Sequence, residues 1–142
     1  MKHLLAAAAA AVTAVFAVPA YAALSPITSD QSLHNVGQCV AVEGTASVRP
    51  DPQRFGTDID VDGEHSSFLG FIPKGNEAQF PDLGSIDGQK VRITGVVHTY
   101  LGRGEVEITS LPQLTAATGE GDSGLTHVGK EFSKNGGGAV CS

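Results

Sequence analysis

The chain is poor in basic residues, in aromatic residues and in cysteine. It holds 9 Lys and Arg against 15 Asp and Glu, which gives a formal net charge of −6, and it has no Trp. A protein that grips nucleic acid over a broad surface needs many Lys and Arg side chains to displace counterions from phosphates. The composition therefore argues against broad phosphate binding, and few aromatic rings are available for base stacking.

The sequence has two cysteines, Cys39 and Cys141, and no C-x-x-C motif. Zinc sites are built from several Cys and His ligands at short spacing, so we expect no metal. An even number of cysteines in an exported chain indicates a disulfide, and we expect Cys39 to pair with Cys141. Two free thiols, or an intermolecular bond from Cys141, are the alternatives.

Motifs for catalysis are missing as well. There is no phosphate-binding glycine loop, no carboxylate pair in a defined cleft and no Cys–His pair. Gly121–Gly124 looks like the nucleophile segment of serine proteases, but the chain is too short for the two barrels of such an enzyme. Asp58, Asp60 and Asp62 copy the first half of a calcium loop, yet the twelfth position, where Glu is required, is Leu69. We expect a protein that is not an enzyme and has no cofactor.

One long apolar run is present, near the N-terminus. Leu4–Val18 is almost wholly apolar and follows a short, weakly basic start. The run is shorter than the roughly 20 residues that span a bilayer. The sequence A-Y-A at 20–22 fits the small-residue rule for signal peptidase. We therefore expect 1–22 to be a signal peptide, and the mature protein to be periplasmic or secreted with no membrane contact after cleavage.

Four segments alternate between apolar and polar residues, which is typical of half-buried strands, and a fifth, at 67–72, is apolar on both faces, as in a strand that is covered on both sides. We expect these strands at about 36–48, 55–61, 67–72, 90–100 and 105–109, with a loop or short helix at 73–89. Gly44 and Gly95 interrupt the first and fourth segments, as glycines do where a strand bends sharply. Asp58, Asp60 and Asp62 occupy the outward positions of the second segment, and we interpret them as a solvated acidic ladder.

Three strands, a connection and two further strands predict an all-β fold: a five-stranded Greek-key barrel of the OB type, with a short helix or loop between strands 3 and 4. The predicted organisation is a signal peptide at 1–22, a lead-in segment at 23–35, the OB-fold domain at 36–117 and a flexible Gly-rich tail at 118–142. The expected disulfide would tie this tail back to the first strand.

Three segments resemble bacterial OB-fold domains of the tRNA-anticodon/helicase type. Val36–Thr45 resembles their opening strand, Gly88–Val97 has their G-x-x-V-x-[IV]-x-G pattern, and Gly102–Ile108 is similar to their last hairpin. The resemblance covers about 33–115. It implies an OB-fold and binding of single-stranded nucleic acid or an oligonucleotide. Exported members of the wider fold also include small envelope proteins with other partners.

A nucleic-acid platform on an OB-fold uses aromatic rings for stacking and basic side chains for the backbone. The candidate ligand-binding residues are Phe68, Phe71, Lys74, Lys90, Arg92, Tyr100 and Arg103. Core phenylalanines and solvated charges are the simpler interpretation of the same residues, and the aspartates of the second strand would repel phosphate. The alternative function is a periplasmic envelope protein that binds a polypeptide or a cationic small ligand through that acidic strand.

Overall fold

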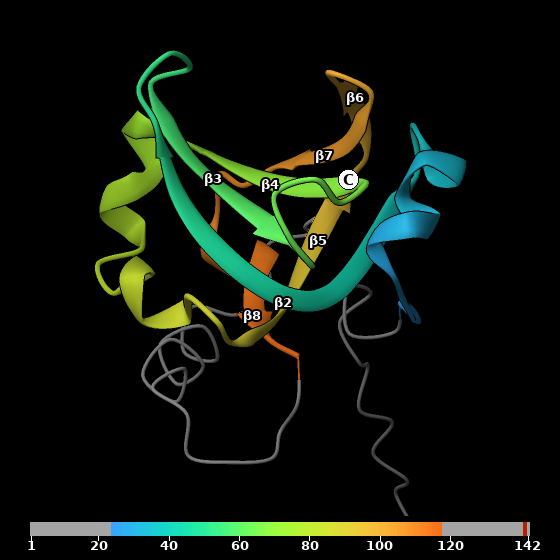
Figure 1. Cartoon of the computed structure of the whole chain (residues 1–142). Coiled ribbons are helices and arrows are strands. Elements are labelled where there is room, and N and C mark those ends of the chain that lie inside the picture. The colour runs from blue at the N-terminus through green and yellow to red at the C-terminus, as the bar shows by residue number, and fades with distance from the viewer. Residues whose placement is uncertain (1–23, 118–140, 142) are drawn as a thin grey trace, which may run out of the picture.

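The computed structural model describes residues 24–117 and residue 141 (Figure 1). The expected signal peptide and nearly all of the expected tail, with Gly121–Gly124, lie outside the described residues. Within the described part of the chain, no helix is long and apolar enough to cross a membrane.

Strands dominate the described residues, so the expected all-β class is confirmed. The eight strands are β1 (Pro26–Ile27), β2 (Cys39–Asp51), β3 (Gly56–Val61), β4 (Phe68–Pro73), β5 (Lys90–Val96), β6 (His98–Tyr100), β7 (Arg103–Glu107) and β8 (Leu114–Ala116). The helices of the same residues are all short 3-10 turns: η2 (Ser29–Asn35), η3 (Lys74–Gln79), η4 (Leu83–Ile86) and η5 (Leu111–Gln113).

The strands form one mixed sheet in the order β6-β7-β4-β3-β2-β5-β8, with β1 parallel to β2. This path is open, so the pairing does not confirm a closed barrel of five strands. The fourth expected segment is divided at Val97 into β5 and β6. The reason lies in the backbone of Val97, which bonds to the chain before β2: its N–H donates to Gln38 (3.1 Å), and its carbonyl accepts from Gly37 (2.7 Å).

The long strand β2 bends so strongly that it belongs to two ladders. Its first half, Cys39–Thr45, pairs with β5, and its second half, Ala46–Asp51, pairs with β3. Figure 1 shows β2 as a wide arc. Gly44 lies just before the change of partner, where a Cβ would meet Val61 Cγ1 at 2.5 Å. The absence of a side chain therefore lets β3 approach β2 closely at the bend, as the sequence predicts for this glycine.

The core is enclosed by the curved sheet, with the short helices at its margins. Its largest fully buried side chains include Phe68, Ile59, Ile72, Ile93 and Ile108. Residues of the expected lead-in pack against the sheet: Ser32 of η2 is fully buried, and its hydroxyl lies within hydrogen-bond distance of the carbonyls of Ser29 (2.7 Å) and Ser67 (3.1 Å).

Cys39 and Cys141 form the expected disulfide, with a Cα–Cα distance of 5.9 Å and 102 positions between them in the sequence. The bond joins the first residue of β2 to the C-terminal end of the chain. A crosslink that closes such a long loop removes much of the conformational freedom of the unfolded chain.

Candidate functional site

The aspartates of β3 are not a solvated ladder. Asp58 is 3% exposed and Asp60 is 1% exposed. Only Asp62, just beyond the strand, is exposed, and its carboxylate accepts hydrogen bonds from the Thr45 backbone (2.9 Å) and the Ser29 hydroxyl (3.3 Å). The expectation was wrong for Asp58 and Asp60 because strand alternation assigns a residue to a face but does not reveal what covers that face.

Three arginines cover the two aspartates and a third buried acid. We call these six residues the charge cluster: Arg49, Arg54, Arg103, Asp58, Asp60 and Glu105. Arg49 contacts both aspartates, through Nη2 to Asp58 Oδ2 (2.9 Å) and Nε to Asp60 Oδ2 (3.3 Å). Arg103 Nη1 lies 2.8 Å from Asp60 Oδ1. Buried carboxylates persist in proteins when they are paired in this way.

The second half of the cluster is built around Arg54. Its guanidinium makes a two-pronged contact with Glu105, which is 1% exposed, including Nη2 to Oε1 at 2.9 Å. His98 Nε2 lies 2.8 Å from the same Glu105 oxygen. The Arg54 guanidinium also lies between two aromatic rings, 3.9 Å from the Phe71 centroid and 3.7 Å from the Tyr100 centroid. A planar guanidinium can stack on aromatic rings and meet both carboxylate oxygens at once, whereas an ammonium meets a carboxylate as a single point charge.

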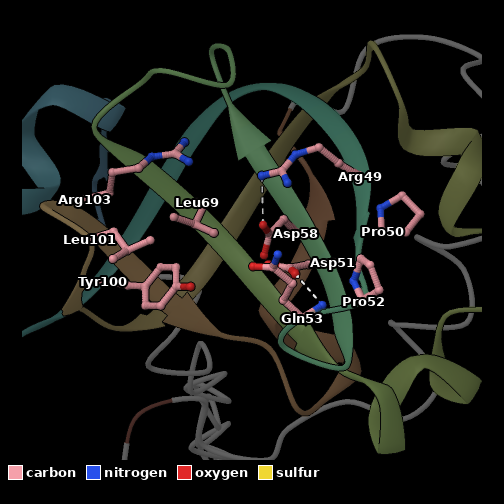
Figure 2. Close-up of a pocket in the computed structure, with 10 residues that line it drawn as sticks. All are labelled: Arg49, Pro50, Asp51, Pro52, Gln53, Asp58, Leu69, Tyr100, Leu101 and Arg103. Carbon is pink, nitrogen blue, oxygen red and sulfur yellow. Dashed lines mark hydrogen bonds and ion pairs between the residues drawn. The ribbon is translucent and has the colours of Figure 1, made fainter.

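A cavity of about 380 Å³ adjoins the charge cluster (Figure 2). It lies between the 52–55 loop, which joins β2 to β3, and the 101–102 turn, which joins β6 to β7. Its lining residues are Arg49, Pro50, Asp51, Pro52, Gln53, Asp58, Leu69, Tyr100, Leu101 and Arg103. The floor is formed by β3 and β4, which contribute Asp58 and Leu69.

Each of the two bordering loops holds a large apolar residue in a left-handed conformation. Phe55 has φ 54° and is 71% exposed, and Leu101 has φ 48° and is 83% exposed. Positive φ costs a residue with a Cβ roughly 1 kcal/mol or more. An exposed apolar side chain also contributes no hydrophobic stabilisation to the fold, because its surface stays in water. Leu101 lines the cavity and gives it an exposed apolar side chain, whereas Phe55 belongs to the bordering loop but does not line the cavity.

Asp58 is the aspartate of the cluster whose charge is less well compensated, because the cation nearest to its Oδ1 is 3.6 Å away, against 2.8 Å for Asp60. Burial raises the pKa of Asp58 above the ordinary value of 3.8, and the negative charges of Asp51 and Asp60 act in the same direction against Arg49 and Arg54. Its Oδ1 has no hydrogen-bond partner within the described residues, and Arg54 Nη1 is 3.6 Å away. Asp60 Oδ1 also has no hydrogen-bond partner within the described residues, but it forms an ion pair with Arg103 Nη1 at 2.8 Å. The charge of Asp60 is therefore better compensated than that of Asp58.

The structure brings three of the residues predicted from sequence to this place. Tyr100 and Arg103 line the cavity, and Phe71 lies beneath Arg54 and is 8% exposed. Phe68 is fully buried in the core.

The remaining candidates do not line the cavity. Lys74 begins η3, Lys90 begins β5, and Arg92 pairs with Glu43 at 2.7 Å. Sequence reasoning missed Arg49, Arg54 and Glu105. The only local signal is the run R-P-D-P-Q-R at 49–54, whose prolines mark a turn without indicating which acids it will meet.

No protein-family model matches the chain, and no curated protein matches it. The site is therefore interpreted from its own geometry. No group of three or more His, Cys, Asp or Glu side chains in residues 24–117 and 141 is arranged to hold a metal ion.

Proposed function

We propose that the mature chain is an exported, non-enzymatic OB-type binding protein whose cavity between the 52–55 loop and the 101–102 turn binds an extended polypeptide segment. The observation that carries this proposal is a mixed apolar and polar cavity whose arginines are paired with buried acids and whose lining includes the exposed apolar side chain of Leu101. Such a surface is complementary to a protein chain, which offers apolar side chains together with backbone donors and acceptors.

The strand arrangement supports the OB-type architecture. β6, at one end of the open path, follows β5 after a single residue, and β5 pairs with β2, so the chain order is compatible with the strand order of an OB-fold. OB-folds bind ligands on the face of their second and third strands, between the loop joining strands 1 and 2 and the loop joining strands 4 and 5. In this assignment β3 and β4 are the second and third strands, and the cavity lies between the corresponding loops.

Two features favour a polypeptide over single-stranded nucleic acid. Arg49 and Arg103 already contact buried carboxylates, so they have less charge to offer a phosphate backbone. The Phe71 ring is covered by Arg54 and is not open for base stacking.

The proposal is tested with a display library of short random peptides, selected on the immobilised mature protein with its disulfide intact. Enriched peptides should lose at least about tenfold in affinity for Leu101→Ser, because a large apolar side chain carries 1.5 to 3 kcal/mol when it is buried. Val96→Ser is the matched control, since Val96 is an exposed apolar residue (47%) that does not line the cavity.

Titration of single-stranded oligonucleotides at increasing salt provides the second arm. Peptides that bind Leu101→Ser as tightly as the wild type would contradict the proposed site. Oligonucleotide binding that weakens steeply with salt, with no peptide enrichment, would instead favour the nucleic-acid function.

A further inference from the structure

The cavity and the charge cluster together contain more acidic than basic groups. Four carboxylates face three guanidinium groups: Asp51, Asp58, Asp60 and Glu105 against Arg49, Arg54 and Arg103. Asp51 carries the excess, because it has no ion pair within the described part of the chain. Its Oδ1 accepts hydrogen bonds from the backbone of Gln53 (3.0 Å) and Arg54 (3.2 Å), so Oδ2 is left for another donor.

Asp58 gives an independent sign that its negative charge is only partly compensated, because the cation nearest to its Oδ1 is Arg54 Nη1 at 3.6 Å. The Asp58 side chain is 4% exposed and lines the cavity, yet Oδ1 has no hydrogen-bond donor in the described residues. The oxygen itself is buried, so a cation in the cavity would act on it across a short distance in a medium of low dielectric rather than by direct contact. Such a cation would favour the ionised carboxylate, which burial now opposes.

We infer that the cavity accepts a basic side chain, Lys or Arg, from the polypeptide of the proposed function, with the charged end at Asp51. This inference rests on the proposed function and specifies the partner's chemistry. The two arginines of the wall do not prevent it, because Arg49 and Arg103 are matched by Asp58 and Asp60 at 2.8 to 3.3 Å.

The rest of the cavity wall suits the aliphatic stem of such a side chain. Pro50, Pro52, Leu69 and Leu101 give it an apolar lining, and Lys and Arg pack their methylene groups along such surfaces while the charged end meets a carboxylate. The fold already holds one of its own residues in this manner, since Arg54 lies between Phe71 and Tyr100 and reaches Glu105. A volume of about 380 Å³ leaves room for the side chain and the adjoining backbone.

The experiment uses two probes, N-acetyl-arginine methylamide and N-acetyl-citrulline methylamide, which have the same shape but differ in charge. Each is titrated into the isotope-labelled mature protein, with its disulfide intact, and binding is followed by NMR at the backbone amides of Asp51, Gln53 and Arg54 and of 100–103. The arginine probe should bind about tenfold tighter or better, the preference expected from one charge-assisted hydrogen bond.

Asp51→Asn is the decisive variant, because asparagine keeps an oxygen to accept the turn hydrogen bonds but has no charge. The preference for arginine over citrulline should disappear in this variant. Asp30→Asn is the matched control: it removes an exposed acid of η2 that does not line the cavity, and the preference should persist.

The outcomes separate this inference from the proposed function. If library peptides bind at the cavity but Asp51→Asn does not change the probe preference, the basic side chain is the wrong chemistry and the polypeptide function stands. An equal loss of preference in Asp30→Asn would reduce the effect to general attraction by the net negative charge and overturn the inference. If neither peptides nor probes shift the cavity amides, the proposed function fails as well.

Discussion

Breaking the Arg54–Glu105 pair should destabilise the protein strongly, and removing both charges should cost less than the two single changes together. Glu105→Gln leaves the Arg54 guanidinium 19% exposed between two rings, with Asp58 3.6 Å away as its remaining acid. Arg54→Met leaves Glu105, 1% exposed, with His98 as its remaining contact. Removal of one partner from a buried ion pair costs about 3 to 5 kcal/mol.

The size of each effect follows from the exposure of the group left behind. Glu105→Gln should lower the free energy of unfolding by about 3 kcal/mol, because Arg54 keeps some contact with solvent and with Asp58. Arg54→Met should lower the free energy of unfolding by about 5 kcal/mol, since it also removes the cation–π contacts with Phe71 and Tyr100. The double variant carries no isolated charge at this place, so the coupling energy should reach about 2 kcal/mol.

Urea denaturation of the oxidised mature protein at neutral pH measures these free energies of unfolding, and unchanged m-values would show that the same transition is compared. His98→Gln serves as the control: it removes a Glu105 contact from a side chain that is 50% exposed and should cost no more than about 1 kcal/mol. Single changes below about 1 kcal/mol, or strict additivity, would show that the pair is not a coupled buried unit and would refute the reasoning.

Three further outcomes follow from the structure. Cys141→Ser should lower the free energy of unfolding by roughly 4 to 5 kcal/mol, because the bond closes a loop of 102 positions; a denaturation midpoint that is the same with and without reductant in the wild type would contradict this. Leu101→Asn should raise stability by about 0.5 to 1 kcal/mol in urea denaturation, because Asn-Gly suits the two positive φ angles at 101 and 102, yet it should weaken peptide binding; a loss of stability would show that Leu101 is packed, not strained. Because the folded state holds the Asp58 proton more tightly than the unfolded chain does, the contribution of Asp58 to the free energy of unfolding should fall as pH rises from 3.8 through the raised pKa. Asp58→Asn lacks this effect, so its stability relative to the wild type should increase across that pH range, and a difference that does not change with pH would argue against the raised pKa.

The sequence predicted the main strands because alternation depends on local residues alone. β2, β3 and β4 lie within a few residues of the expected segments, and Gly44 lies at the bend. The short strands β1 and β8 were not predicted, since two or three residues are too few to show a period. The division of β5 from β6 depends on Val97 bonding to residues 37 and 38, a contact between distant parts of the chain.

The candidate site was harder to predict, because its decisive contacts join residues far apart in sequence. Arg54 and Glu105 are 51 positions apart, and nothing local to either residue indicates the other. Alternation placed Asp58 and Asp60 on the outer face of β3 but could not show that three arginines cover it. Tyr100 and Arg103 were predicted because aromatic and basic side chains suit a nucleic-acid platform, and both line the cavity.

The sharing of β2 between two ladders has a consequence for how the domain opens. Neither half of the sheet can detach as a separate unit, because the strand that would have to leave one ladder is continuous with the strand that holds the other. Amide hydrogens on β3 and on β5, although they lie on different partners, should then exchange with solvent at similar free energies that approach the global value. We therefore expect the two ladders that share β2 to unfold in one cooperative transition.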